Sequence, residues 1–331
     1  MKLAVGFLTY SDVTVRYLPD FLASLEKALA FLSSDQYRVY AFDNSAKDDT
    51  QNRAVVESFN QGQGAAAPRQ SVRYLTQGVN LGFSRAYNIL IRSAFKEGAE
   101  YFLVINPDTV LESDAIEHLI ASLQVDPKLA AAAPKILRWD FAGGKIKTDI
   151  VDSLGLVLKS GLKFSDAEQG SEDRGQSASI VGPTGAAGLF RLRALETIAL
   201  TPAGGEPQYF DESFFMYKED CDLAYRLFRA GFRSATVSSA LVYHDRTAAA
   251  ASGLWANISR RGEKSRQIRA WSFRNQHYLF LKHWKNQNIV NRLLIIFRAI
   301  LLFVFSLILE QFLLKEYISI FRFRRELTNI K

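Results

Sequence analysis

The chain has 331 residues, of which 48% are hydrophobic and 23% are charged, and a single cysteine, Cys221. This composition makes a globular protein the default and excludes an intrachain disulfide, and one cysteine fits a reducing, cytoplasmic setting. The net charge of +7 is unevenly placed, because residues 253–331 hold fifteen Lys or Arg against four Glu, which is +11 and leaves −4 for the first 252 residues. The basic character therefore belongs to the C-terminal part of the chain.

The first 105 residues alternate between short apolar runs and segments with helical spacing. The N-terminal run is too short and too quickly polar for a signal peptide, so we expect it to be a strand. Alternation of this kind predicts a doubly wound, mostly parallel sheet with helices between its strands. The predicted strands are 3–8, 37–42, 71–75 and 101–105, and the predicted helices are 17–32, 52–59 and 85–96.

Polar residues follow three of these four strands at the point where each strand ends. They are Thr9-Tyr10-Ser11, Asp43-Asn44 and Asn106-Pro107-Asp108. Ligands of open α/β sheets bind at the carboxyl ends of the strands, and a carboxylate there can hold a hard cation and, through it, a diphosphate. The alternative for the third group is an ordinary turn in which Pro107 ends a buried strand.

The second half of the chain contains a glycine-rich segment and an acidic centre. Residues 141–175 are poorly periodic and predict a hairpin and a loop, and the small residues of 180–191 allow a close backbone approach. Glu219 and Asp220 begin a predicted helix after an aromatic run, where an acid can be a general base or merely favour the helix dipole. His244 follows a predicted last strand, 232–242, and is either structural or a metal ligand.

These blocks, in this order, resemble family 2 glycosyltransferases of the GT-A fold, and most closely the bacterial rhamnosyltransferase-like members. The resemblance covers roughly residues 3–245 and includes Asn80-Leu81-Gly82-Phe83-Ser84, Asn106-Pro107-Asp108 and the block from Phe210 to Arg226. One departure is that Asn106 stands where the family has the first Asp of its metal motif. An amide can still bind a cation through oxygen but supplies no charge.

The resemblance implies a role for each matched residue. Asp220 would be the catalytic base, and Asp108 with His244 would hold Mg²⁺ or Mn²⁺ on the diphosphate. The remaining residues would contact the acceptor (Gly185, Phe215 and Glu219) or the nucleotide sugar (Thr9, Tyr10, Ser11, Asp43, Asn80, Gly82, Arg85 and Asn106).

The implied function is that of an inverting, metal-dependent glycosyltransferase of the hexosyltransferase type in cell-surface polysaccharide synthesis. The donor would be a dTDP- or UDP-linked sugar, with rhamnose favoured by the resemblance and galactofuranose and common hexoses open. The acceptor would be a saccharide, free or linked to polyprenyl diphosphate. The alternative is a non-catalytic module of the same fold that binds a sugar nucleotide or a partner. A nucleotidyltransferase fits less well, because Thr9-Tyr10-Ser11-Asp12 has neither glycine nor a nearby lysine.

We expect a GT-A catalytic domain at 1–250, with a nucleotide-binding half at about 1–110 and an acceptor half at about 111–250, and a helical extension at 251–331. The segment 289–309 is mostly Leu, Ile and Phe, and on a helix its polar residues share an arc of about 120°. These are Asn288, Asn291, Arg292, Arg298, Ser306 and Glu310.

A narrow polar arc with flanking basic and aromatic residues favours a helix in the membrane interface, on the inner face of the cell membrane. Packing on the catalytic domain, a homo-oligomer formed through these helices, and a spanning helix stay as alternatives. Nucleic acid is a poor fit, because the basic residues of 253–284 lead into long apolar runs.

Overall fold

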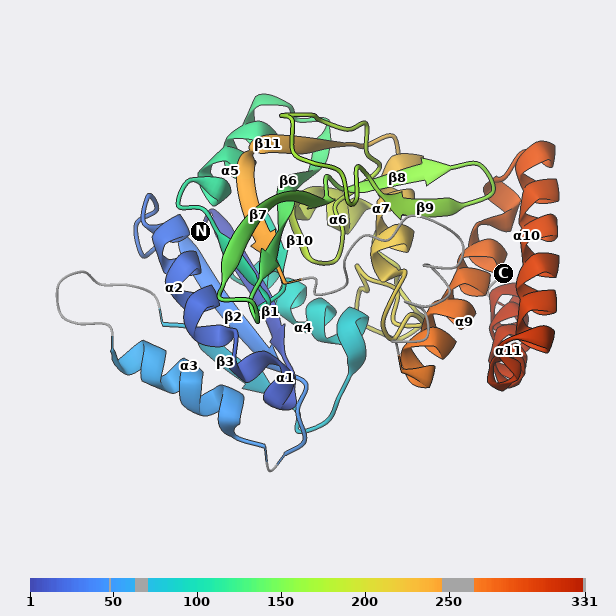
Figure 1. Ribbon diagram of the computed structural model, residues 1–331, viewed down its shortest axis with the longest axis horizontal. Helices are drawn as coiled ribbons and strands as arrows, with labels where there is room; N and C mark the ends of the chain where they lie inside the picture. Colours follow the sequence, from blue (N-terminus) through green and yellow to red (C-terminus); the bar gives the residue numbers. More distant parts are fainter. Residues whose placement is uncertain (48, 63–70, 246–264, 330–331) are drawn as a thin grey trace. The chain divides into compact units, whose positions relative to one another are not determined.

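The computed structural model describes residues 1–47, 49–62, 71–245 and 265–329 (Figure 1). The chain forms two compact units, and each is described here by itself. The first unit comprises the described residues within 1–157, 166–215 and 219–247, and the second those within 158–165, 216–218 and 248–331. The domain boundary that the sequence predicts near residue 250, and the boundary between the two predicted halves, stay predictions.

The elements of the first unit alternate between strands and helices as the sequence predicts, with the hairpin β8–β9 leading into the second unit. In chain order they are β1 (Leu3–Thr9), α1 (Ser11–Val15), α2 (Leu18–Leu29), β2 (Tyr37–Asp43), α3 (Gln51–Gln61), β3 (Arg73–Thr76), α4 (Gly82–Lys96), β4 (Tyr101–Ile105), β5 (Thr109–Leu111), α5 (Ala115–Val125), β6 (Leu129–Asp140), β7 (Ile146–Ser153), β8 (Leu156–Lys159), β9 (Lys163–Asp166), β10 (Ala187–Arg191), α6 (Leu192–Thr197), α7 (Glu219–Arg229) and β11 (Arg233–His244).

The main sheet has the strand order β3-β2-β1-β4-β10-β6-β11-β5, and β7 pairs with β6. The strands β3, β2, β1 and β4 are parallel, which confirms the doubly wound half that the sequence predicts. Beyond β4, β10 is antiparallel to both of its neighbours, β6 and β11 are parallel, and β5 closes the edge antiparallel to β11. The two strands that flank the β4–β5 connection are thus separated by three others.

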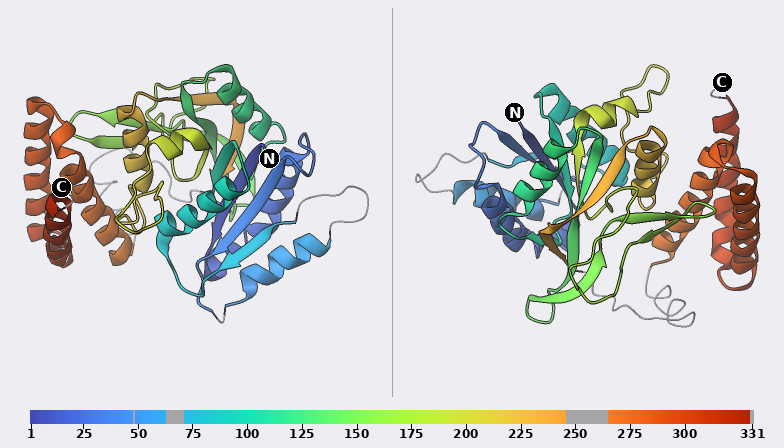
Figure 2. Two further views of the ribbon diagram at one scale, coloured as in Figure 1. Left: turned by 180° about the vertical axis from the view of Figure 1, so that it is seen from behind. Right: turned by 90° about the horizontal axis from the view of Figure 1, so that it is seen from above.

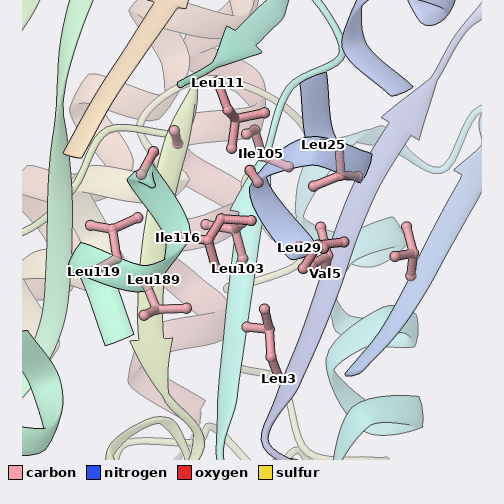
Figure 3. Packing of buried hydrophobic residues seen from close by; sticks show 14 of the residues in the cluster. Leu3, Val5, Leu25, Leu29, Leu103, Ile105, Leu111, Ile116, Leu119 and Leu189 are labelled. Carbon is pink, nitrogen blue, oxygen red and sulfur yellow. The ribbon is translucent and has the colours of Figure 1, made fainter. Parts of the chain in front are cut away.

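Alternating residues of β4 face two different hydrophobic clusters. Leu103 and Ile105 pack with residues of α2 and α5 (Figure 3), and Tyr101 belongs to the same cluster. Phe102 and Val104 pack with residues of α4. Helices therefore cover both faces of this strand, which explains why its sequence is continuously apolar rather than alternating. The end of this buried strand is fixed in position, and so is the polar segment that follows it.

The second unit consists of the tip of the β8–β9 hairpin, residues 216–218 and a group of helices. Those helices are α9 (Arg266–His283), η1 (Trp284–Asn286), α10 (Ile289–Ile308), η2 (Gln311–Lys315) and α11 (Glu316–Asn329). Within this unit α10 and α11 run side by side (Figure 1, Figure 2), and the rings of Phe303 and Tyr317 are 5.6 Å apart. The part of the basic segment 253–284 that precedes residue 265 lies outside the described residues.

One helix among the described residues, α10, is long and apolar enough to cross a membrane. It has 20 residues and a mean hydropathy of 2.1, and 11% of its apolar window is buried. Length and composition alone do not distinguish a spanning helix from one that lies on a membrane or packs against protein, so the contacts of α10 must decide between them.

Candidate active site

The sheet brings together the β4–β5 connection and the last residue of β11. His244 lies opposite Thr109 in the register of β11 and β5, and the amide of Asp245 donates to the carbonyl of Asp108 at 2.9 Å. As a result the imidazole Nε2 of His244 lies 3.4 Å from Oδ2 of Asp108. Two residues that are 136 positions apart in sequence therefore face each other because of strand register.

Asp152, at the end of β7, holds the other nitrogen of this imidazole. Nδ1 of His244 lies 2.9 Å from Oδ2 of Asp152, whose side chain is buried. Burial opposes a charge on the imidazole, but Asp108 and Asp152 outweigh it and raise the pKa of His244 to about 10. A carboxylate on Nδ1 leaves Nε2 pointing toward Asp108, as in the carboxylate–histidine arrangement of metal sites.

Asp108 and His244 fit a divalent cation, judged by the chemistry of the atoms they present. Oδ1 of Asp108 is buried and accepts no hydrogen bond from the described residues, so an oxygen there is available to a ligand. No group of three or more His, Cys, Asp or Glu suited to a metal occurs among the described residues. These two residues therefore suit a cation that takes its other ligands from a bound substrate and water.

Asp220 lies at the N-terminus of α7 and is hydrogen-bonded to the glycine-rich segment. Its Oδ2 accepts from the amide of Gly185 at 3.1 Å, and the next carbonyl, that of Ala186, accepts from the amide of Asn106 at 2.9 Å. Gly185 and Ala186 thus bond to both acidic regions. The start of α7, with Glu219 and Asp220, and the turn Asn106–Asp108 therefore lie on either side of one short segment.

Gly82 packs directly against the aromatic run that precedes Asp220. Its φ is +75°, and a Cβ at this position would lie 2.3 Å from the carbonyl oxygen of Phe215, so no larger residue fits without a shift. The side chain of Asn80 accepts from the Gly82 amide at 2.9 Å, and the amide of Phe83 donates to the Phe215 carbonyl at 2.7 Å. A residue predicted to bind the nucleotide sugar, Gly82, is thus in contact with one predicted to bind the acceptor saccharide, Phe215.

The loop after β2 is held by the carboxylate of Asp43, which is buried. Its Oδ1 accepts from the amide and hydroxyl of Ser45 at 3.0 and 2.6 Å, and its Oδ2 accepts from the hydroxyl of Tyr74. Burial, and then the hydrogen bond to Asp43, raise the pKa of Tyr74, so this hydroxyl stays a donor. Asp43 therefore shapes the loop, and it retains lone pairs for a ligand.

The loop after β1 is tied to the loop after β2. The amide of Ser11, whose φ is +45°, donates to Oγ of Ser45 at 2.7 Å. Thr9 is buried and Tyr10 is exposed. The structure thus brings two of the predicted polar strand ends together.

Two further predicted residues, Arg85 of α4 and Glu219 of α7, differ in their exposure. The Arg85 side chain is 62% exposed, and its Nε lies 3.6 Å from the carboxylate of Glu212. Glu219 is buried at the start of α7. The structure therefore offers Arg85 to a ligand at the surface, whereas Glu219 belongs to the interior.

Sequence reasoning did not identify Asp152, or the anchor formed by Tyr17 and Asp245. The Tyr17 hydroxyl donates to Asp245, and burial together with that carboxylate raises the pKa of Tyr17 to about 12. Asp245 is adjacent to His244 and could have been found by that position. Asp152 lies in a stretch that the sequence interprets as a hairpin and a loop, and it offered no signal.

Comparisons with known proteins show the family to which the chain belongs. A model of the family described as glycosyltransferase like family 2 matches residues 22–268. Two curated relatives, from Mycobacterium tuberculosis strains CDC 1551 / Oshkosh and ATCC 25618 / H37Rv, are each 29% identical over 260 residues, which cover 70% of this chain and 74% of the relative. Both are named N-acetylglucosaminyl-diphospho-decaprenol L-rhamnosyltransferase.

Solved structures are similar at lower sequence identity. The structure of GalNAc-T7 with UDP, GalNAc and Mn²⁺ has a TM-score of 0.54 and 11% identity, over 84% of this chain and 51% of the solved one. Residues 1–349 of S. aureus TarS give a TM-score of 0.48 and 15% identity, over 74% of this chain and 60% of that one.

The fold and the matched blocks define the class of protein, a glycosyltransferase with the GT-A fold. The chain belongs to glycosyltransferase family 2, and it is a sugar-transferring enzyme. The family that the sequence resembles is thereby confirmed, whereas the roles of the individual residues stay predictions.

Proposed function

We propose that this enzyme transfers a sugar, with rhamnose favoured, from a nucleoside diphosphate to a hydroxyl of a saccharide carried on polyprenyl diphosphate. Transfer occurs with inversion and depends on a divalent cation. The kind of acceptor is supported by the names of the mycobacterial relatives, which act on a decaprenol-linked sugar. An acceptor carried on a membrane lipid would place the protein at the cytoplasmic face of the cell membrane, bound peripherally.

One observation carries the proposal. The segment Gly185–Ala186 bonds to Asp220 on one side and to Asn106 on the other, and Asp108 with His244 follows directly. A base and a candidate cation site are therefore separated by a few residues of glycine-rich backbone. A sugar that bridges a diphosphate and an acceptor hydroxyl needs these two groups at such a separation.

Asp220 supplies the acid–base chemistry. A saccharide hydroxyl is a weak nucleophile near neutral pH, and a carboxylate within hydrogen-bond distance removes its proton as the bond to the anomeric carbon forms. The Gly185 amide and the backbone amide of Cys221, which donates to Oδ1 at 2.7 Å, hold this carboxylate in one orientation. A single displacement by one base inverts the anomeric configuration.

Asp108 and His244 would hold Mg²⁺ or Mn²⁺. When bound, the cation stabilises the negative charge that develops on the departing nucleoside diphosphate. Asp152 accepts from Nδ1 of His244, so Nε2 is the nitrogen that would give up its proton and coordinate the cation. Asn106, which has no charge, leaves Asp108 as the one carboxylate of its motif.

The proposal is tested with Asp220→Asn, measured with a range of nucleotide-activated sugars and a lipid-linked acceptor. We expect transfer to fall by about 10²-fold or more while nucleoside diphosphate binding, measured by thermal shift with Mn²⁺, is unchanged. Glu117→Gln, on the exposed face of α5, is the matched control and keeps full activity. Turnover near the wild-type rate in Asp220→Asn would exclude this residue as the base.

Two further measurements address the cation and the donor. EDTA abolishes transfer, and added Mg²⁺ or Mn²⁺ restores it; activity that persists in EDTA contradicts the proposed cation dependence. In a thermal-shift panel, a larger shift with dTDP than with UDP supports a dTDP-sugar donor, and the reverse order supports a UDP-sugar.

A further inference from the structure

Helix α10 exposes an apolar surface along its whole length. Only Ile295 and Ser306 of this helix are buried. The exposed large hydrophobic residues between Ile289 and Leu309 include Phe297 at 58% and Ile308 at 70% exposure. On α11, Ile318 and Phe321 are exposed in the same way. We call the exposed large hydrophobic residues of 289–309, together with Ile318 and Phe321, the apolar face.

The polar arc of α10 is turned toward the protein. Oδ1 of Asn291 accepts from the Gly161 amide at 3.1 Å, and Arg298 donates to the Gly161 carbonyl at 2.8 Å. Ser306 is completely buried, and Glu310, just after the helix, accepts from Arg269 at 2.8 Å. The helix is therefore inverted relative to an ordinary surface helix, with its polar groups inside and its apolar groups outside.

We propose that the apolar face inserts into one leaflet of an anionic membrane, with α10 parallel to the membrane plane. This deepens the proposed function, on which it rests, by naming the surface that meets the lipid. The basic residues Lys285, Lys315, Arg322 and Arg324 are exposed beside the apolar residues in sequence and match acidic headgroups.

Two other occupants of this face fit less well. A spanning helix would carry its polar residues to membrane depth, where their partners must lie too, but the arc of α10 is bonded to the β8–β9 hairpin tip at Gly161 and to Arg269 through Glu310. A second copy of the chain would bring the same exposed arginines against each other. An anionic leaflet satisfies the apolar face and the basic residues together.

Flotation of the full chain with vesicles tests the proposal without donor or acceptor, so its result is independent of the transfer reaction. Vesicles of phosphatidylcholine with phosphatidylglycerol should capture the protein, and phosphatidylcholine alone should capture much less. Phe297→Asp and Ile300→Asp should each lower the partition coefficient about tenfold. Val125→Asp, at an 85% exposed position of α5, is the matched control and binds as the wild type does.

Spin labels measure the orientation of the helix. Val290→Cys, Leu301→Cys and Ile308→Cys place labels within about 20° of one another on the helix, and the first and last are about 27 Å apart along it. The native Cys221 is buried and should not be labelled. Equal depths at the three positions support the proposal, whereas a label at 301 that lies deepest indicates a spanning helix. A dimer in light scattering that Phe297→Asp dissolves, without capture by vesicles, would overturn it.

A second, independent observation concerns Asn275 of α9. Its side chain is completely buried, and its Nδ2 donates to the carbonyls of Met216 and Tyr217 at 2.8 and 2.7 Å. Tyr217 and Lys218 have φ values of 72° and 74°, a conformation that side chains other than glycine rarely adopt. The carbonyls on either side of the first strained residue, Tyr217, are thus held by one carboxamide.

We infer that Asn275 is a positioning residue for the candidate base. Lys218 is joined by a peptide bond to Glu219, the first residue of α7, and the next residue is Asp220. Release of the strained pair would let the start of α7 change its direction. This inference rests on the role proposed above for Asp220, and the Asp220→Asn measurement tests that role separately.

Asn275→Leu removes both hydrogen bonds. We expect kcat to fall about tenfold, with the KM for the donor and the thermal shift by nucleoside diphosphate unchanged. Lys218→Gly in the same chain should restore part of kcat, because glycine adopts this φ without strain. Gln287→Leu, which removes another buried carboxamide of this unit, is the control and keeps kcat. A lower melting temperature with wild-type kcat in Asn275→Leu would show a purely structural role.

Discussion

Helices α4 and α10 are both amphipathic, but they present opposite faces to the unit to which each belongs. Helix α4 buries Phe83, Tyr87 and Leu90 against the sheet, whereas α10 exposes its large apolar residues and buries Ser306. The same 3.6-residue period is present in both sequences. Periodicity therefore predicts that a helix has two faces, and the partners available to each face decide which one lies inside.

The largest expected difference comes from one aspartate substitution in each helix. Leu90→Asp places a charge at a completely buried position and should cost more than about 5 kcal/mol, which leaves the first unit unfolded. Ile300→Asp, at a 54% exposed position, should change the free energy of unfolding by less than about 0.5 kcal/mol. Urea denaturation measures both, and similar losses would contradict the inverted orientation of α10.

Two arginine–carboxylate pairs extend the comparison to charge. Nε of Arg226 lies 2.8 Å from Asp222, whose side chain has no exposed surface, and Arg269 lies 2.8 Å from Glu310, which is slightly exposed. Arg226→Met should cost about 3–5 kcal/mol, because it removes the cation from a fully buried carboxylate. Arg269→Met should cost less. The change in the urea midpoint gives both values, and an equal cost would mean that burial does not distinguish the pairs.

The smallest expected effect separates backbone strain from space. Gly82 and Gly98 have φ values of +75° and +71°, but a Cβ meets Phe215 at Gly82 and nothing within 4 Å at Gly98. Gly98→Ala should cost about 1 kcal/mol for φ alone, and Gly82→Ala about 1–3 kcal/mol, with a fall in kcat. Thermal melting and initial rates measure these effects. If Gly82→Ala costs no more free energy than Gly98→Ala and keeps full activity, the close approach of Gly82 to Phe215 is not required for stability or activity.

The sequence predicts the parallel half of the sheet well for a physical reason. The strand Tyr101–Ile105 is buried on both faces, so its composition alone identifies it and Pro107 marks its end. Helix α4 begins at Gly82, three residues before the predicted start, and the Asn80 side chain accepts from the Gly82 amide there at 2.9 Å. Local composition predicts secondary structure well where a residue packs against neighbouring strands and helices of the same βα repeat.

The candidate site is less predictable, because it depends on strand register. His244 meets Asp108 through the β11–β5 pairing, and its other partner, Asp152, comes from a strand that the sequence interprets as part of a hairpin. The resemblance to a family identified the two ligands, but nothing in the local sequence connects either of them to Asp152. The Gly185 bond to Asp220 likewise joins segments that are 35 residues apart.

The position of β10 between β4 and β6 has a consequence for biosynthesis. The ribosome must deliver residue 191 before β4 gains its second neighbour, although β4 itself is complete at residue 105. During that interval the edge of a strongly apolar strand stays open to other chains. A nascent chain of this protein should therefore depend on a chaperone for longer than the early βα repeats alone would require.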